Sequence, residues 1–193
     1  MGKDVAVNLE QERQATFQSA VQYYEGIGGE KDLGKAFHLF ENAGQQGDVQ
    51  SQFNAGMMSL RGEGTAQDSA NARNWFLRAA QNGYVDAYFQ LGLLAYNGTS
   101  EKQDFRKALD LFTAAALGGS ADAQFNEGVM YLKGQGSPKD PVEAYAWFTV
   151  AKNHGSKGAK NGLNALSSSL TSSQRSKAKS IAADIERKIL SPK

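Results

Sequence analysis

The sequence predicts an all-α protein built as an α/α solenoid, and three observations lead to that prediction. Residues of the same type recur every 36 positions, through four copies with no insertion or deletion. The clearest series is the phenylalanines Phe40, Phe76, Phe112 and Phe148. Within each copy, apolar residues recur at helical spacings of three and four, and glycines separate two helical runs. An internal period of this length is typical of repeat proteins, in which neighbouring helix pairs stack to bury their apolar faces.

Residues 1–14 lead into the first repeat. Val5, Val7 and Leu9 alternate with polar residues over a stretch too short for a strand. We expect a loose lead-in, with the first helix starting near Leu9 or Glu10. The segment lacks the apolar core of a signal peptide, so we expect either a cytoplasmic protein or a mature exported form, and we prefer the exported form.

Each repeat should contain a helix, a glycine loop, a second helix and a glycine turn. The four repeats are expected at residues 15–50, 51–86, 87–122 and 123–158. An aspartate precedes every second helix, where its carboxylate can accept a backbone N–H as an N-cap. These aspartates are Asp32, Asp68, Asp104 and Asp140. In the fourth repeat, Pro141 and Glu143 extend the cap to a variant capping box. The turn glycines Gly83 and Gly119 suit a left-handed C-terminal cap.

Residues 159–193 hold a degenerate half repeat and a final helix. Thr171 and Gln174 form a capping box that starts this helix, which we expect to end near Leu190. Its apolar stripe comprises Ala178, Ile181, Ala182, Ile185, Ile189 and Leu190. The polar residues expected to face solvent are Arg175, Lys177, Lys179, Asp184, Glu186 and Lys188. A helix with one apolar and one polar face is the terminal cap that a solenoid requires.

Several short runs in the fourth repeat point to a known family. They are Gln124-Phe125-Asn126-Glu127-Gly128, Gly134-Gln135-Gly136, Asp140, Ala144, Trp147-Phe148 and Ala151. The pattern resembles the Sel1-like repeat, whose unit is similar to the tetratricopeptide repeat with a longer loop, and it covers about three quarters of the chain. The resemblance implies a right-handed superhelix of four helix-turn-helix repeats with a C-terminal capping helix. Two departures are local, because Ala20 and Ser100 stand where other repeats have glycine.

Composition narrows the classes of function. The chain carries 21 Lys and Arg and 20 Asp and Glu, a net charge of +1, with the two signs interspersed. This pattern provides no basic stripe of the kind that binds nucleic acid. The absence of cysteine excludes disulfides, thiolate nucleophiles and cysteine metal sites. No segment approaches the ~20 apolar residues that span a membrane, so we expect no membrane insertion.

Candidate catalytic residues are few. His38 and His154 occupy different repeat positions, and we expect each to be exposed or hydrogen-bonded rather than a metal ligand or general base. Ser176 and Lys179 match an S-x-x-K pattern, but the S-D-N and K-T-G companions of that pattern are missing. The capping role explains the repeated aspartates without a cation. The sequence therefore predicts a non-enzymatic protein with no cofactor and no metal.

Partner binding is the better-supported function. Helical spacing places four residues of each first helix on one strip, and the resemblance to tetratricopeptide repeats implies that this strip lines a groove. The candidate groove residues are Phe17, Tyr24, Phe53, Met57, Arg61, Phe89, Tyr96, Asn97, Phe125 and Lys133. The phenylalanines could instead belong to the core. One further position carries carboxamides, which we expect to form a hydrogen-bonded ladder between repeats. Its members are Gln18, Asn54, Gln90 and Asn126.

We therefore expect a protein-interaction scaffold that presents a groove to a peptide or partner protein. Burial of apolar side chains would supply affinity, and the charges at the rim would set specificity. Two alternatives stay open from the sequence: a serine hydrolase or cell-wall-active enzyme, and a structural spacer in a larger assembly. The sequence does not identify the partner or the oligomeric state.

Overall fold

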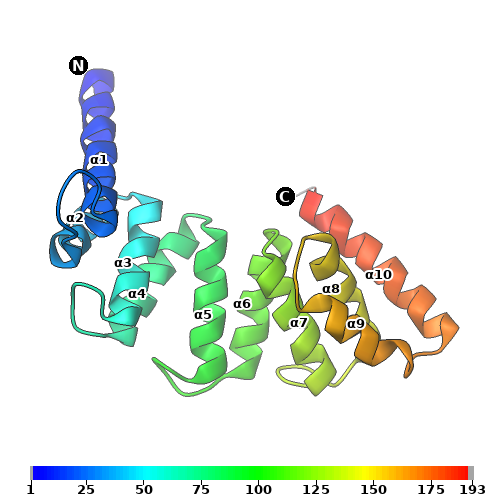
Figure 1. The fold of residues 1–193 in the computed structure, drawn as a ribbon. Coiled ribbons are helices and arrows are strands. Elements are labelled where there is room, and N and C mark those ends of the chain that lie inside the picture. Colours follow the sequence, from blue (N-terminus) through cyan, green and yellow to red (C-terminus); the bar gives the residue numbers. More distant parts are fainter. Residues whose placement is uncertain (1, 191–193) are drawn as a thin grey trace. The chain divides into compact units, whose positions relative to one another are not determined.

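The computed structural model describes residues 2–190, and it describes side chains from residue 7 onward (Figure 1). Over the described residues the chain forms ten helices and no strand, which confirms the predicted all-α class. The helices are α1 (Gly2–Glu25), α2 (Leu33–Gln45), α3 (Val49–Arg61), α4 (Ser69–Gln81), α5 (Val85–Asn97), α6 (Phe105–Leu117), α7 (Ala121–Lys133), α8 (Pro141–Asn153), α9 (Ala159–Ser167) and α10 (Ser172–Leu190).

The helices group into two compact units. Unit 1 is Met1–Tyr84 and contains α1–α4, whereas unit 2 is Val85–Lys193 and contains α5–α10. From α1 to α4 and from α5 to α9, each helix packs on the helix that follows it, whereas α10 packs mainly on α8. Each unit therefore holds two helix pairs, and unit 2 also holds the C-terminal helices.

The repeated phenylalanine forms the centre of each helix pair. Phe40, Phe76, Phe112 and Phe148 are all 2% exposed or less. Three of these rings lie against a glycine of the preceding helix, and a Cβ on Gly56 would stand only 2.6 Å from the Phe76 ring. The glycine is thus needed for the close approach of the two helices. Removing such a ring costs about 3–5 kcal/mol in typical cores, so these residues dominate the stability of each pair.

The predicted N-caps are confirmed. Asp32, Asp68, Asp104 and Asp140 each accept a backbone N–H from the first turn of the following helix. The variant capping box at Asp140 is only half formed, because the Asp140 N–H donates to the Tyr131 carbonyl instead of meeting Glu143. The capping box of α10 is complete, since Thr171 and Gln174 each accept from the other's backbone N–H. The turn glycines Gly83 and Gly119 have φ of +81° and +95°, as predicted.

The expected loose lead-in is wrong. Helix α1 begins at Gly2 rather than near Leu9 or Glu10, so most of the segment before the first repeat is helical. Val7 and Leu9 are 56% and 58% exposed on this helix. Because they are not part of a buried face, their spacing does not follow the helical period. A helix without a buried stripe leaves no apolar periodicity in the sequence.

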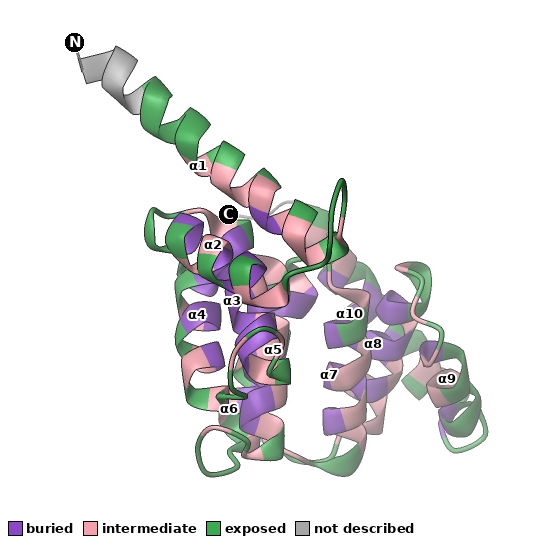
Figure 2. Cartoon of the chain, turned by 60° about the vertical axis from the view of Figure 1, so that its left-hand side comes forward, coloured by how far each residue is buried: buried purple, intermediate pink, exposed green. Residues whose placement is uncertain are grey.

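Helix α10 caps unit 2 largely as predicted. Ala178, Ala182 and Ile185 are buried against α6–α8, and Figure 2 shows this buried face of α10 beside α8. Three details of the prediction are wrong. Leu190 is 80% exposed rather than part of the apolar stripe. Arg175 is half-buried and donates to the carbonyls of Ser167 and Leu170, and Glu186 is also half-buried, in contacts described below.

Candidate partner-binding surface

The predicted strip has the same pattern of exposure on the first helix of every repeat. Its apolar members are half-buried in every copy, from Phe17 on α1 to Phe125 on α7. Its last position is exposed in every copy, where Arg61, Asn97 and Lys133 stand. The strip therefore has the graded exposure of a surface that is partly covered by its own fold and partly open.

Each strip phenylalanine packs on the core phenylalanine of its own repeat. The ring centroids are 5.9 Å apart for Phe17 and Phe40, and 5.6 Å for Phe53 and Phe76. The same pairing recurs in unit 2, at 5.7 Å for Phe89 with Phe112 and 5.5 Å for Phe125 with Phe148. Such tilted pairs stabilise the core by about 0.5–1.5 kcal/mol each. These four rings therefore contribute to the core and still offer one edge to the surface.

A hollow of about 270 Å³ opens on this strip in unit 1. Its apolar wall comes from Val21, Phe40, Phe53, Met57 and Met58, on α1, α2 and α3. Polar groups complete the lining, namely Tyr24, Glu25, Asn54, Arg61 and Glu63. The hollow thus gathers four predicted groove residues, Tyr24, Phe53, Met57 and Arg61, around one concave site. It is of a size to take one side chain of a partner rather than a whole small molecule.

The rim of the hollow is charged. The Tyr24 hydroxyl donates to Glu63 Oε2 at 3.0 Å, and Arg61 Nη1 lies 3.8 Å from Glu63 Oε1. Burial of the ring, together with the bond to Glu63, raises the pKa of the Tyr24 hydroxyl above its usual value. Glu25 stands exposed at the end of α1 on the same rim. Glu63 lies in the loop after α3, so the helical spacing of the strip does not include it.

The carboxamide ladder is wrong. Among the described side chains, no hydrogen bond joins Gln18 to Asn54 or Gln90 to Asn126. Gln18 is exposed, and Asn126 donates within its own helix to the carbonyl of Asp122 at 2.8 Å. Asn54 instead lines the hollow of unit 1.

Buried glutamines two positions earlier tie the helices together. Gln52 is 4% exposed, and its amide donates to the Gly44 carbonyl at 2.9 Å. Gln124 is fully buried and donates to the Ala116 carbonyl at 3.0 Å. Both bonds join the first helix of one repeat to the last turn of the helix before it. The signal was present in the sequence, since Gln52 and Gln124 stand 72 residues apart, a period of two repeats.

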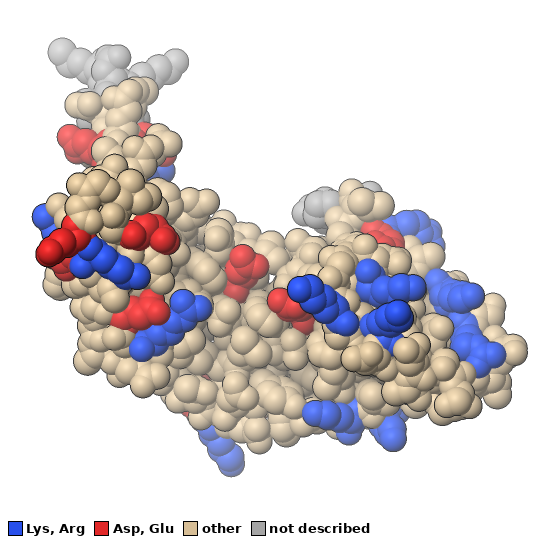
Figure 3. Space-filling model, viewed as in Figure 1, with Lys and Arg blue, Asp and Glu red and all other residues tan. Residues whose placement is uncertain are grey.

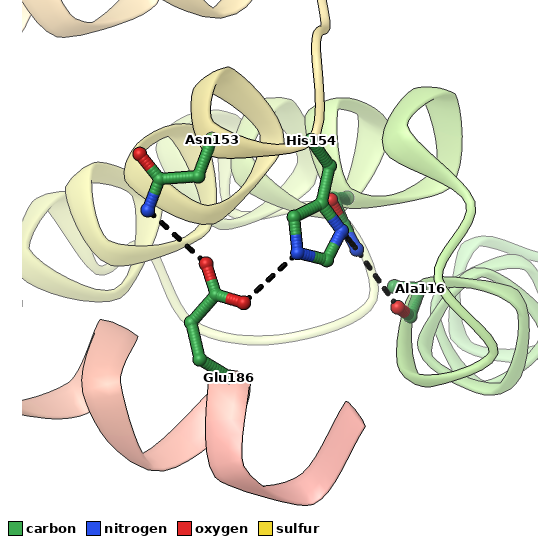
Figure 4. Close-up of polar contacts among 5 residues, drawn as sticks. Ala116, Asn153, His154 and Glu186 are labelled. Carbon is green, nitrogen blue, oxygen red and sulfur yellow. Dashed lines mark hydrogen bonds and ion pairs between the residues drawn. The ribbon is translucent and has the colours of Figure 1, made fainter. Parts of the chain in front are cut away.

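Gln124 also begins a chain of hydrogen bonds that reaches α10 (Figure 4). Its Nε2 lies 3.0 Å from His154 Nδ1, and His154 Nε2 lies 2.9 Å from Glu186 Oε2. The carbonyl of Ala116 can only accept, so the Gln124 nitrogen faces both partners and His154 Nδ1 must accept as well. His154 is then the tautomer whose Nε2–H donates to Glu186, to which Asn153 also donates. The histidine is therefore hydrogen-bonded, and it links α7 to α10.

One carboxyl group is buried in unit 2. Glu127 is 1% exposed, and burial is the main reason that its pKa rises to about 8. Its Oε1 lies 2.8 Å from the Thr113 hydroxyl, which also lies 2.9 Å from the Leu109 carbonyl. The Thr113 hydroxyl has one proton and can donate it to either oxygen. A protonated Glu127 could in turn donate to the hydroxyl while that proton bonds the Leu109 carbonyl.

The residues considered for catalysis do not assemble into a site. Ser176 and Lys179 are both exposed on α10, and His38 is exposed on α2 beside Glu41. Within residues 2–190, no group of three or more His, Asp or Glu side chains is placed to hold a metal ion. Over the same residues, no helix has the length and apolar character needed to cross a membrane.

Comparison with solved structures finds similar helical-repeat proteins. The Sel1 repeat protein of Oxalobacter formigenes matches with a TM-score of 0.75 and 27% identity, over 80% of this chain and 63% of that one. The protective antigen c5321 of uropathogenic Escherichia coli, which displays an SLR fold, matches at 0.55 and 22%, over 92% of this chain and 46% of that one. Helicobacter pylori cysteine rich protein B matches at 0.54 and 23%, over 68% of this chain and 94% of that one.

This chain therefore spans less than two thirds of the length of the first two structures. The second and third similarities show the fold alone. None of the curated proteins compared with the chain is detectably similar to it.

The family model of the Sel1 repeat matches four consecutive segments of the chain. The matched residues are 14–48, 49–84, 85–120 and 121–156. The boundary between the second and third segments coincides with the boundary between the two units. Four matched repeats, together with the all-helical architecture, establish that the chain belongs to the Sel1 repeat family and has its helical-repeat solenoid fold.

Proposed function

We propose that this protein is a non-catalytic interaction scaffold that takes up an apolar side chain of a peptide or partner protein in the hollow of unit 1. The observation that carries the proposal is the hollow itself, with a wall of Phe40, Phe53 and Met58 and a charged rim. A small apolar cup surrounded by polar groups is the usual form of a recognition hot spot. The Sel1 repeat fold supports a scaffold, because stacked helical repeats present extended surfaces to partners.

The energetics favour uptake of one side chain. The wall residues are fixed by packing in the core of unit 1, so they lose little freedom when a partner binds. The binding free energy comes from burying apolar surface in a preformed site, and the surrounding contacts exclude water. The strip on α5 and α7 of unit 2 would offer further contacts through Phe89, Tyr96, Asn97, Phe125 and Lys133.

The experiment selects short peptides from a displayed random library on the intact chain and measures their affinity by fluorescence anisotropy. Met57→Lys places a charge in the half-buried wall of the hollow. We expect this variant to bind the selected peptides about tenfold more weakly or worse, the loss typical of a hot-spot residue. Asn74→Lys is the matched control, because it adds the same charge at an exposed position of α4.

Circular dichroism and thermal melting must show that both variants are folded. Selected peptides that bind Met57→Lys as tightly as the wild type would place the binding surface away from the hollow and contradict the proposal.

A further inference from the structure

Each residue that lines the hollow has a counterpart in unit 2, two repeats later in the sequence. Adding 72 to the number of each lining residue gives a residue of unit 2 at the same repeat position. The apolar wall is retained, since Phe40, Phe53 and Met58 correspond to Phe112, Phe125 and Met130. The same period relates Gln52 to Gln124 and Trp75 to Trp147. Repeats 1 and 2 thus form one composite block, and repeats 3 and 4 repeat that block.

The charge of the rim is not retained. Glu25 corresponds to Asn97, and Glu63 corresponds to Gln135, while Arg61 corresponds to the equally basic Lys133. Each carboxylate is thus replaced by an amide, and the rim of unit 2 carries one positive charge where the rim of unit 1 carries a net negative charge. Gln135 has the size of Glu63, whereas Asn97 is one methylene shorter than Glu25. The change common to both positions is the loss of a negative charge.

The fold does not require these carboxylates. The Tyr24 hydroxyl donates to Glu63 at 3.0 Å, and the Tyr96 hydroxyl donates to the Gln135 Oε1 at the same 3.0 Å. An amide oxygen therefore serves the structural contact as well as a carboxylate does. The negative charge of Glu63 is additional to that contact, and so is the charge of Glu25, which is exposed on the rim.

The charge of the whole of each unit has the same sign as its rim. Residues 1–84 carry seven Lys and Arg against ten Asp and Glu, whereas residues 85–193 carry fourteen against ten. The net charges are therefore −3 and +4. In the view of Figure 3, side chains of both signs lie over unit 1, and basic ones predominate over α8–α10 of unit 2. Fields of this kind steer charged partners toward the unit of opposite sign.

We propose that the hollow of unit 1 selects a peptide segment in which a basic residue flanks the apolar residue it takes up, and that the corresponding surface of unit 2 does not accept this segment. The apolar residue fills the wall formed by Phe40, Phe53 and Met58. The flanking Lys or Arg lies beside Glu25 and Glu63, whose charges unit 2 lacks. This inference rests on the proposed function and adds the chemistry of the partner.

Exposed ion pairs contribute little to affinity, so the expected selectivity is about fivefold to tenfold. Salt should reduce it, because the rim charges are open to solvent.

The test uses three synthetic peptides with the same central phenylalanine, flanked on both sides by lysine, glutamine or glutamate. Fluorescence anisotropy against the intact protein should show the lysine peptide binding about fivefold to tenfold more tightly than the glutamate peptide. In Glu25→Asn with Glu63→Gln, which installs the residues of unit 2, this preference should disappear and the glutamine peptide should bind as before. Glu12→Gln with Glu30→Gln is the matched control, since it removes two exposed acids of unit 1 outside the hollow and should retain the preference.

The outcomes separate this inference from the proposed function. Equal binding of all three peptides, each lost in Met57→Lys, would overturn the charge selectivity and leave the scaffold intact. Failure of every peptide to bind would contradict the scaffold itself. A wild-type dimer that Met57→Lys dissociates would show that a second copy occupies the hollow, and it would overturn the proposal of a basic peptide.

Discussion

At the scale of single residues, Glu127 is the group whose chemistry conflicts most with its surroundings. Its equivalents in repeats 2 and 3 are Ala55 and Leu91, both buried and apolar. A carboxylate at this position is costly, because burial disfavours the charged form. The raised pKa of about 8 means that the group is held as the neutral acid near neutral pH. A neutral acid can donate to Thr113, and burial makes the protonated form the more stable one at this position.

The first prediction concerns the pH dependence of stability. The folded pKa lies above that of the unfolded chain, so the folded state binds the extra proton, and the unfolding free energy falls as pH rises from about 4.5 to about 8. Glu127→Gln keeps a donor to Thr113 and removes the titration. We expect it to raise the unfolding free energy by roughly 3–4 kcal/mol at pH 8 and by little at pH 4.5. Denaturant unfolding across this pH range is the measurement.

Glu30→Gln provides the control for that experiment, since Glu30 is exposed in the loop after α1. Its unfolding curve should follow the wild type at every pH. If the unfolding free energy of Glu127→Gln falls with pH as steeply as that of the wild type, other groups cause the pH dependence of stability.

At the scale of elements, the loop between α3 and α4 is fixed by contact with the start of α2. Gly64 has φ of +71°, and a Cβ there would stand 2.1 Å from the Leu33 carbonyl oxygen. Gly28 occupies the same position in repeat 1 with φ of +79°, yet a Cβ there would meet nothing within 4 Å. In repeat 2 the second loop glycine therefore permits both a positive φ and the close approach to Leu33, whereas in repeat 1 it permits only a positive φ. In repeat 3 the position is Ser100, and no described residue other than glycine has a positive φ, so the backbone takes another conformation there.

Alanine substitutions of these two glycines distinguish the cost of backbone strain from the cost of a steric clash. Gly28→Ala should cost about 1–2 kcal/mol, the penalty of a left-handed backbone for a residue with a Cβ. Gly64→Ala should cost about 1–3 kcal/mol more, because the loop must also move away from α2. The measurement is the unfolding free energy of each variant. Equal losses in the two variants would mean that the loop is not held against Leu33.

The elements also show which parts of the fold could be predicted. Helix pairs, aspartate caps and turn glycines depend on local chain chemistry, so the 36-residue period located them. The hydrogen bonds of the buried glutamines depend on which face of a helix meets the helices before and after it. Gln52 and the expected Asn54 differ by two positions, or about 200° around the helix, so an error of two residues placed the ladder on nearly the opposite face. The partners of Glu186 are Asn153, the last residue of α8, and the following His154, and the 36-residue period does not relate them to Glu186.

Only part of the candidate site could be predicted from the sequence. The strip residues on the first helices follow helical spacing, so Tyr24, Phe53, Met57 and Arg61 could be named from the sequence. Glu63 entered the site through the loop, and Phe40 and Met58 entered through packing of α2 and α3. Such contributions depend on tertiary contacts that a single helix does not specify.

At the scale of the whole molecule, the chain consists of two compact units, and α10 belongs to the second. A repeat array needs its last apolar face covered, and α10 covers α8 through Ala178, Ala182 and Ile185. The contact is reinforced by Glu186, which accepts from Asn153 and His154 at the end of α8. The C-terminal helix should therefore be part of the cooperative structure of unit 2.

The final prediction tests that role without shortening the chain. Ala182 is 4% exposed on the inner face of α10, whereas the next residue, Ala183, is exposed. Ala182→Asp would bury an unpaired carboxylate and should lower the unfolding free energy of unit 2 by about 2–4 kcal/mol. Ala183→Asp makes the same chemical change at the surface of the same helix and should melt like the wild type. Hydrogen exchange should quicken in residues 85–190 of Ala182→Asp and stay unchanged in residues 7–84, because the units are separately compact. Unchanged melting of Ala182→Asp would show that α10 does not stabilise unit 2. Equally fast exchange in both units would show that the chain unfolds as one cooperative body.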